Sequence, residues 1–428
     1  MIAEFGLAQG LSQVAGMLCG LIYVRFMTVD EYAIYALCLS ALGLAAVGSD
    51  LGLTGSLNYF WRDGMQTGHP IGPKIAAVRK LRLVLLAVAL TISATLLLTS
   101  TSKQAVSSVP LLLSLGLVAI TALLQSRSGV EIQVMRLDGR QRQSYYCESA
   151  GSLIRLMGAV AMIVAGIGTA WFGLTGGVLG AIATYCFAQR FRADSAREHH
   201  PVRAEDWLAI RRYLLPLAPS VAVFMIQEPL VYWFAATRGG AVPVAEVFAL
   251  GRIGALYGLV GTFTHMVLTP RLARINDNAQ FLRVCGLCLS VLCVASAGVL
   301  AVAWFVPQLL LLLIGQSYAH LQTELIVAMA TATAANLTAF LILTGRVRGW
   351  VAIDPYMAIY QITAIAVLCS LWKFDSTIAV LELNLWLAFS SLICAAATFT
   401  LGLARPELVT PARETAGQAA ESRPMEPH

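Results

Sequence analysis

Twelve stretches of this chain are each long and apolar enough to cross a lipid bilayer, and they limit the possible folds sharply. A spanning helix needs about 20 mainly apolar residues. Only helices and closed barrels satisfy their own backbone groups within hydrocarbon. These runs are continuous and lack the period-two alternation of barrel strands, so they predict helices. The predicted spans are 3–24, 33–55, 83–99, 109–125, 145–167, 171–189, 214–235, 244–268, 284–305, 323–342, 354–372 and 378–402.

The composition agrees with a membrane protein. Of the 428 residues, 58% are apolar and only 12% are charged, whereas charged residues make up about 25% of a typical soluble domain. A soluble core of this size cannot bury so much apolar surface, which excludes a cytosolic enzyme, a disordered chain and a secreted disulfide scaffold. The nine cysteines all lie within or at the edges of spans, so neither a disulfide framework nor a metal site is predicted.

The basic residues of the loops predict the orientation. Loops on one side of the predicted spans, together with the tail, carry 23 of the 29 Lys and Arg residues, and loops on the other side carry four. By the positive-inside rule, both termini are cytoplasmic and the protein is a multi-pass protein of the cell (inner) membrane. The net charge of +6 therefore reflects topology and contact with anionic lipid rather than nucleic-acid binding. Segment 3–24 is too long for a signal peptide and lacks a basic start, so it is expected to stay as the first helix.

A long charged loop divides the predicted helices into two groups of six. We expect an N-terminal lobe at 1–190, a cytoplasmic linker at 191–213, a C-terminal lobe at 214–402 and a disordered tail at 403–428. The echo between AIYAL at 33–37 and EVFAL supports two related halves. Transporters built from such repeats hold their binding site between the repeats. The sequence thus predicts an all-α membrane protein with two six-helix lobes around a central cavity.

Ionisable residues inside predicted spans are the first candidates for function, because a buried charge in the membrane is costly. Glu148, Ser152 and Arg155 follow one another at helical spacing and share one face. Two interpretations are open. The three form a self-neutralising network within the helix bundle, or they line a water-filled cavity in which Arg155 attracts an anion.

The seventh and eighth spans add three further candidates. Glu228 directly precedes Pro229, and this order predicts a kink with a carboxylate at it, a candidate site for a coupling proton or Na+. Arg252 is expected at a similar depth and is a candidate partner of Glu228 or a cavity residue. His265 can titrate near neutrality and is a second coupling candidate. For each, the alternative is a paired packing residue.

Polar amides supply the remaining candidates. Gln9 and Gln13 share one face of the first span, where they suit either sugar hydroxyls or hydrogen bonds to a neighbouring helix. Asn336 and Gln361 lie in the tenth and eleventh spans and are further cavity candidates. Arg25 ends the first span on a different face from its glutamines, as an interfacial anchor would.

Enzyme motifs are missing from the sequence. It contains no Walker A motif, no H-E-x-x-H, no G-x-S-x-G and no paired carboxylates in a loop. We therefore predict a transporter rather than an enzyme, with no metal and no bound cofactor. Its energy would come from an H+ or Na+ gradient, the membrane potential or the substrate gradient.

Three segments resemble the polysaccharide flippases of the MATE-like (multidrug/oligosaccharidyl-lipid/polysaccharide exporter) superfamily. Residues 25–57 end a first helix in Arg, continue through an acidic loop with Tyr and close the second helix on Asp-Leu-Gly-Leu. Residues 267–275 are similar to the Pro-basic exit of the eighth helix, and residues 306–320 to the Leu-rich, Gly, Tyr element after the ninth. The G-x-x-x-D-R-x-G-R-R loop of major-facilitator sugar carriers is missing.

This resemblance implies a flippase for exopolysaccharide and other surface polysaccharide biosynthesis. Its substrate would be a polyprenyl-diphosphate-linked oligosaccharide, moved from the inner to the outer leaflet by alternating access around a cationic cavity. Arg25 and Arg252 match positions where such flippases place cavity cations. The partners implied are the lipid-linked oligosaccharide, membrane lipids and the polysaccharide polymerase or export machinery.

Three alternatives remain open. An ion-coupled small-molecule or drug exporter of the same superfamily would favour an acidic and aromatic cavity. A membrane glycan polymerase or ligase would need a large outward catalytic loop, for which the predicted loops leave no room. A scaffold that binds lipid-linked sugars without moving them is the third.

Overall fold

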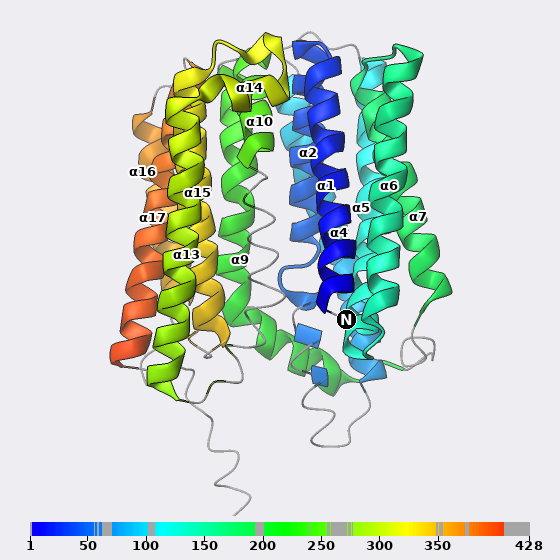
Figure 1. The fold of residues 1–428 in the computed structure, drawn as a ribbon. Coiled ribbons are helices and arrows are strands. Elements are labelled where there is room, and N and C mark those ends of the chain that lie inside the picture. Colours follow the sequence, from blue (N-terminus) through cyan, green and yellow to red (C-terminus); the bar gives the residue numbers. More distant parts are fainter. Residues whose placement is uncertain are drawn as a thin grey trace, which may run out of the picture.

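The protein is an upright bundle of helices that run roughly parallel to one another (Figure 1). The computed structural model describes residues 2–54, 56–57, 60–61, 71–101, 108–192, 201–238, 240–254, 257, 272, 275, 277–347, 350, 354–372 and 376–405. The predicted tail beyond Arg405 therefore lies outside the described residues, as does most of the predicted loop at 56–71.

Six long helices make up what we call the N-terminal bundle. They are α1 (Ile2–Phe26), α2 (Val29–Gly48), α4 (Gly72–Thr101), α5 (Ser108–Leu137), α6 (Gln141–Ala165) and α7 (Ala170–Arg190).

The helices that follow make up the C-terminal bundle. They are α9 (Ala204–Arg238), α10 (Ala241–Gly254), α13 (Asn278–Phe305), the short α14 (Pro307–Ile314) with a 3-10 turn η3 (Gln316–Tyr318), α15 (Gln322–Val347), α16 (Asp354–Leu371) and α17 (Thr377–Ala404). Each predicted span overlaps one of the longer helices of the two bundles, which confirms the all-α fold. The helix α9 begins at Ala204, inside the range predicted as a linker.

The outer surface of the bundle is suited to lipid. Within the described residues, eight helices are long and apolar enough to cross a membrane, and Gly10–Phe26 and Pro355–Leu371 are shorter apolar helices. Large apolar side chains such as Val164, Val294 and Phe305 are exposed on the outside. Exposed apolar surface of this extent marks contact with a membrane, so this is a multi-pass membrane protein.

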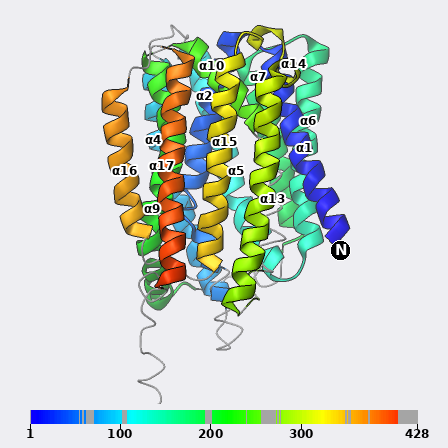
Figure 2. The same cartoon turned by 60° about the vertical axis from the view of Figure 1, so that its left-hand side comes forward.

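The two bundles meet most closely at the end of the molecule where α1 finishes and α14 lies, which we call the α14 end (Figures 1 and 2). There α1 contacts both α10 and α14, and along its length α2 packs against α9 and α10. The largest core cluster spans both bundles and includes Tyr23, Tyr35, Leu250 and Ile314. Smaller clusters around Leu53 and around Phe281 lie apart from it.

Glycines allow close packing of α6 against α7 in the N-terminal bundle. A Cβ atom at Gly180 would lie 2.6 Å from the carbonyl oxygen of Gly151 and 3.2 Å from Cβ of Arg155. Small residues that let helix backbones approach are common in membrane helix pairs. This contact fixes the stretch of α6 that carries Arg155.

We expect Gly180→Ala to lower the thermal stability of the purified protein, because the added methyl group must push α6 and α7 apart. Overpacking of this kind costs about 1–3 kcal/mol. The matched control is Gly177→Ala in the same helix, where an added Cβ meets nothing within 4 Å. Equal melting temperatures for the two variants in a fluorescence-detected thermal unfolding assay would contradict this account of the packing.

Candidate functional site

Two arginines from different bundles come together beside a group of buried tyrosines. Arg252, on α10, directs its Nε toward the Tyr32 hydroxyl at 3.5 Å, and its guanidinium carbon lies 5.5 Å from the centre of the Phe248 ring. Its stem crosses α1 at Gly20, where an added Cβ would lie 3.0 Å from Cδ of the arginine. The glycine therefore gives Arg252 its route from the C-terminal bundle to the N-terminal bundle.

Arg155, on α6, reaches the same group from the N-terminal bundle. It interacts electrostatically with Tyr23 and Tyr35, and Tyr35 interacts in the same way with both arginines. The rings of Tyr23 and Tyr35 meet edge to face with their centres 4.8 Å apart. We call Tyr23, Tyr32 and Tyr35 the tyrosine cluster. Arg155 interacts with Tyr23, Arg252 with Tyr32, and both interact with Tyr35.

These two positive charges lack acidic partners in the described part of the chain, where neither Arg155 nor Arg252 forms an ion pair. Among the described residues, the buried Nη2 atom of Arg252 has no hydrogen-bond partner. Like charges close together in a medium of low dielectric repel strongly. Each arginine would therefore be stabilised by an anion nearby. The side chain of Glu228, the predicted partner of Arg252, lies outside the described residues.

A cavity of about 1060 Å³ lies next to the arginine pair, between α2, α9, α10, α15 and α17. Phe248 lines this cavity and also contacts Arg252, and the cavity reaches Gly251 and Gly254 on the same helix. The arginines themselves are not lining residues, so they lie beside the cavity rather than in it. Most lining side chains are apolar. The polar ones are Ser40, Gln227, Thr331, Asn336, Thr338, Asn384 and Ser391.

The predicted amide candidates fall in different places. Asn336 lines the cavity. Gln361 does not: its side chain is 1% exposed and its Nε2 donates to Ser391 Oγ at 2.9 Å, which joins α16 to α17. Gln13 is half-buried on α1 and has a partner of its own. The side chain of Gln9 lies outside the described residues.

The other predicted residues of α1 and α6 mostly make contacts within the N-terminal bundle. Ser152 shares a hydrogen bond of 2.8 Å with Ser12 of α1. Glu148 pairs with Arg136 of α5 at 2.7 Å. Arg25 is exposed at the end of α1, beside Gly315 rather than beside the arginine pair. His265 lies outside the described residues.

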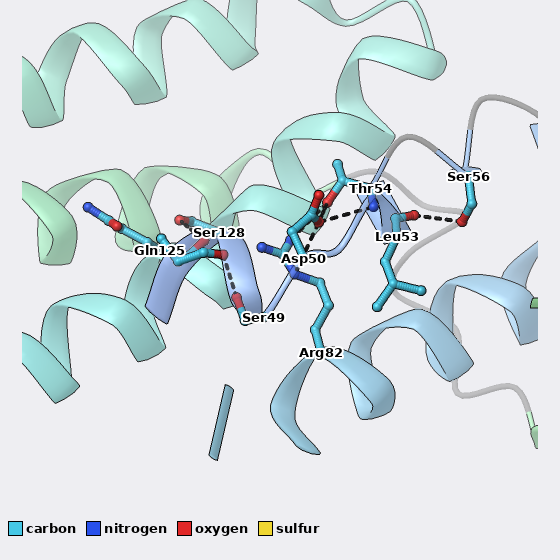
Figure 3. Close-up of polar contacts among 9 residues, drawn as sticks. Ser49, Asp50, Leu53, Thr54, Ser56, Arg82, Gln125 and Ser128 are labelled. Atoms are coloured by element: carbon cyan, nitrogen blue, oxygen red, sulfur yellow. Dashed lines mark hydrogen bonds and ion pairs between the residues drawn. The ribbon is translucent and has the colours of Figure 1, made fainter. Parts of the chain in front are cut away.

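The Asp-Leu-Gly-Leu element at the end of α2 is a turn held by an ion pair (Figure 3). Asp50 Oδ1 accepts from the Thr54 backbone N–H at 3.1 Å and from the Thr54 hydroxyl. Arg82 Nη1 donates to the Thr54 hydroxyl at 3.0 Å, and its Nε lies 3.5 Å from Asp50 Oδ1. Leu51 and Gly52 adopt positive φ, at 41° and 86°, so Gly52 suits a left-handed position. The Asp-Leu-Gly-Leu motif, which carries the family resemblance, thus has a structural role: it forms the turn that ends α2.

A buried carboxylate at the α14 end was not predicted from the sequence. Glu246, near the start of α10, lies 2.9 Å from Nε2 of His320 and accepts a hydrogen bond from the hydroxyl of Thr377, the first residue of α17. Burial raises the pKa of the nearby Tyr318 hydroxyl, and the negative charge of Glu246 raises it further. No spacing rule connects these residues, which are far apart in the sequence.

The comparisons with known proteins bear on the fold. No family model and no curated protein matches this sequence. An inward-facing structure of a multidrug resistance MATE family transporter of the MOP superfamily superposes with a TM-score of 0.65 at 15% identity, over 93% of this chain and 95% of that one. The chain has the MATE-like fold.

Two further structures share this fold. The lipid II flippase MurJ, in an inward closed conformation, superposes with a TM-score of 0.66 at 10% identity, over 94% of this chain and 87% of that one. A MOP superfamily transporter from Pyrococcus furiosus, described by the reverse polarity of its binding pocket, gives 0.62 at 15% identity and 94% coverage of both chains. These matches confirm the MATE-like fold that the sequence resemblance implied. The neighbours are transporters, and the likeness itself extends to the fold alone.

We expect Glu246→Ala to destabilise the α14 end, because it leaves the Thr377 hydroxyl and His320 without their shared acceptor. A buried donor that loses its partner costs about 1–3 kcal/mol. His320→Ala should cost less, since the His320 side chain is 62% exposed. The control is Glu382→Ala on the exposed face of α17. Equal melting temperatures for Glu246→Ala and the control would show that the Glu246 carboxylate does not stabilise the α14 end.

Proposed function

We propose that this protein is a flippase that moves a polyprenyl-diphosphate-linked oligosaccharide from the inner to the outer leaflet during surface polysaccharide biosynthesis. The observation that carries the proposal is the meeting of Arg155 and Arg252 without an acidic partner in the described part of the chain. The function proposed is transport, with no catalytic step.

The chemistry of the arginine pair suits a diphosphate. A charged head with attached sugars cannot cross hydrocarbon unaided, because burying unpaired polar groups is costly. Guanidinium groups bind phosphate oxygens through paired, charge-assisted hydrogen bonds. A diphosphate that lies between two such groups offsets the repulsion between their positive charges. The polyprenyl tail would stay in the surrounding lipid.

The placement of the two arginines also suits alternating access. Arg155 belongs to the N-terminal bundle and Arg252 to the C-terminal bundle, so a bound anion would tie the bundles together and its release would let them separate. With both termini cytoplasmic, the α14 end faces outward, and there the bundles share their largest core cluster. The conformation described would therefore be closed on the outer side.

Membrane partners follow from the same proposal. Membrane lipids would surround the apolar faces, and a polymerase or export system would take the delivered glycan at the outer surface. The inner membrane of the cell is the proposed location. One neighbour of this fold is described as a lipid II flippase, and this supports a lipid-linked substrate.

A second candidate function is export of a small molecule or drug. The mainly apolar lining of the cavity favours it, as do neighbours described as multidrug transporters. Against it, the described lining residues include no acidic side chain to attract a cationic drug. The arginine pair would also repel such a drug.

We expect Arg155→Ala and Arg252→Ala, made separately, each to reduce glycan export at least tenfold, since each removes one half of the anion site. Export is measured as surface polysaccharide restored to a strain of the native host that lacks the gene. The control is Arg190→Ala, an exposed arginine at the end of α7. Membrane levels of every variant are compared by immunoblot. Export at the wild-type level by both arginine variants, at normal abundance, would refute the anion site.

We also propose that transport is driven by an H+ or Na+ gradient, with Glu228 as the coupling carboxylate and His265 as the second candidate. Glu228→Gln should abolish the dependence of export on that gradient, because an amide cannot exchange a proton or balance a bound cation. The measurement is transport into proteoliposomes at varied pH and varied Na+. An unchanged response to both would exclude Glu228 as the coupling site.

A further inference from the structure

We propose that three amides in the cavity, Gln227, Asn336 and Asn384, form the subsite for the sugars of the substrate, separate from the arginine pair that holds the diphosphate. We call these three residues the amide wall. This inference rests on the proposed flippase function and adds to it a site for the neutral, hydroxyl-rich part of the substrate.

The amide wall comes from three helices that meet around one space. Gln227 belongs to α9, Asn336 to α15 and Asn384 to α17, and all three line the cavity of about 1060 Å³. Within the described structure, the Gln227 Oε1 and Asn336 Nδ2 atoms are buried without hydrogen-bond partners. Unpaired buried polar atoms cost free energy. An unpaired acceptor and an unpaired donor on two side chains that line the same cavity therefore point to a ligand that supplies both.

The uncharged lining of the cavity, in the described residues, favours a neutral ligand. The described lining residues carry no charged side chain, so these side chains give no electrostatic reason to hold an ion. An amide both donates and accepts hydrogen bonds, as a sugar hydroxyl does. The rings of Tyr232, Phe248 and Phe340 also line the cavity and offer flat apolar surfaces against the C–H faces of sugar rings.

The amide wall and the arginine pair are close enough to serve one substrate. An added Cβ at Gly254 on α10 would lie 3.5 Å from Cβ of Ala332 on α15, so these two positions are in contact. Asn336 follows Ala332 by about one helical turn, or ~5–6 Å along α15. Arg252 precedes Gly254 by two residues. Phe248 contacts the Arg252 guanidinium and also lines the cavity, so a diphosphate at Arg252 would have its first sugars near the edge of the cavity.

The test uses the full-length protein in lipid nanodiscs and two probes. One probe is polyprenyl diphosphate without sugar, and the other is the pool of polyprenyl-diphosphate-linked oligosaccharide extracted from the native host. We expect the wild-type protein to bind the glycosylated lipid at least tenfold more tightly than the bare lipid. Asn336→Ala with Asn384→Ala should abolish this difference and leave the affinity for the bare lipid unchanged.

Three control measurements make the result decisive. Gln316→Ala removes an exposed amide of η3 outside the cavity and should bind both probes like the wild type. Arg252→Ala should weaken binding of both probes. Melting temperatures check the folding of each variant, and the single variants Asn336→Ala and Asn384→Ala carry the test if the double variant does not fold.

The possible failures can be told apart. Equal binding of the two probes by the wild type, or wild-type binding of the glycosylated lipid by the amide variants, overturns the amide wall and leaves the arginine site standing. No binding of either probe overturns the proposed function itself. Tight binding of tetraphenylphosphonium that the amide variants lose would assign the cavity to drug-like cations and overturn the sugar subsite.

Discussion

Two positive charges inside the helix bundle, without an acidic partner among the described residues, are the constraint on which the rest of this structure depends. Arg155 and Arg252 approach each other through the tyrosine cluster, whose hydroxyls offer dipoles but no full negative charge. The surrounding helices are shaped to permit this. Gly20 opens a path for the stem of Arg252, and Gly180 lets α7 support the turn of α6 that carries Arg155. Close packing thus holds both charges in place beside the tyrosine cluster.

Charged side chains and uncharged amide side chains lie in two neighbouring regions of the structure. Charge is concentrated where α1, α2, α6 and α10 meet, and uncharged amides face the cavity between α9, α15 and α17. Phe248 touches both regions, so its ring forms the partition between them. A substrate with a charged head and neutral sugars would match this division better than a uniformly apolar compound.

The sequence predicted the helices well because their signal is local: an apolar run of sufficient length is visible without knowing its neighbours. It also singled out Arg155 and Arg252 as candidates, since a charge within such a run is conspicuous, and the structure places both beside the tyrosine cluster. The sequence could not predict the surroundings of these arginines, because folding brings Tyr32 and Arg252 together from distant parts of the chain. Amides showed the same limit. Asn336 and Gln361 are both amides within apolar spans, yet Asn336 lines the cavity and Gln361 joins α16 to α17. Gln227 and Asn384 also line the cavity, but they were not among the candidates predicted from the sequence.

Each bundle fastens its own last helix at the α14 end. Glu31 of α2 accepts from the backbone N–H of Ala170, the first residue of α7, at 2.6 Å, and Glu246 of α10 accepts from Thr377, the first residue of α17. Both fastenings close within a single bundle, whereas the core shared by the two bundles there is largely apolar. Apolar contacts have little directional preference, and hydrocarbon chains replace them readily. Polar contacts therefore tie each helix to its own bundle, and the joint between the bundles relies mainly on apolar packing.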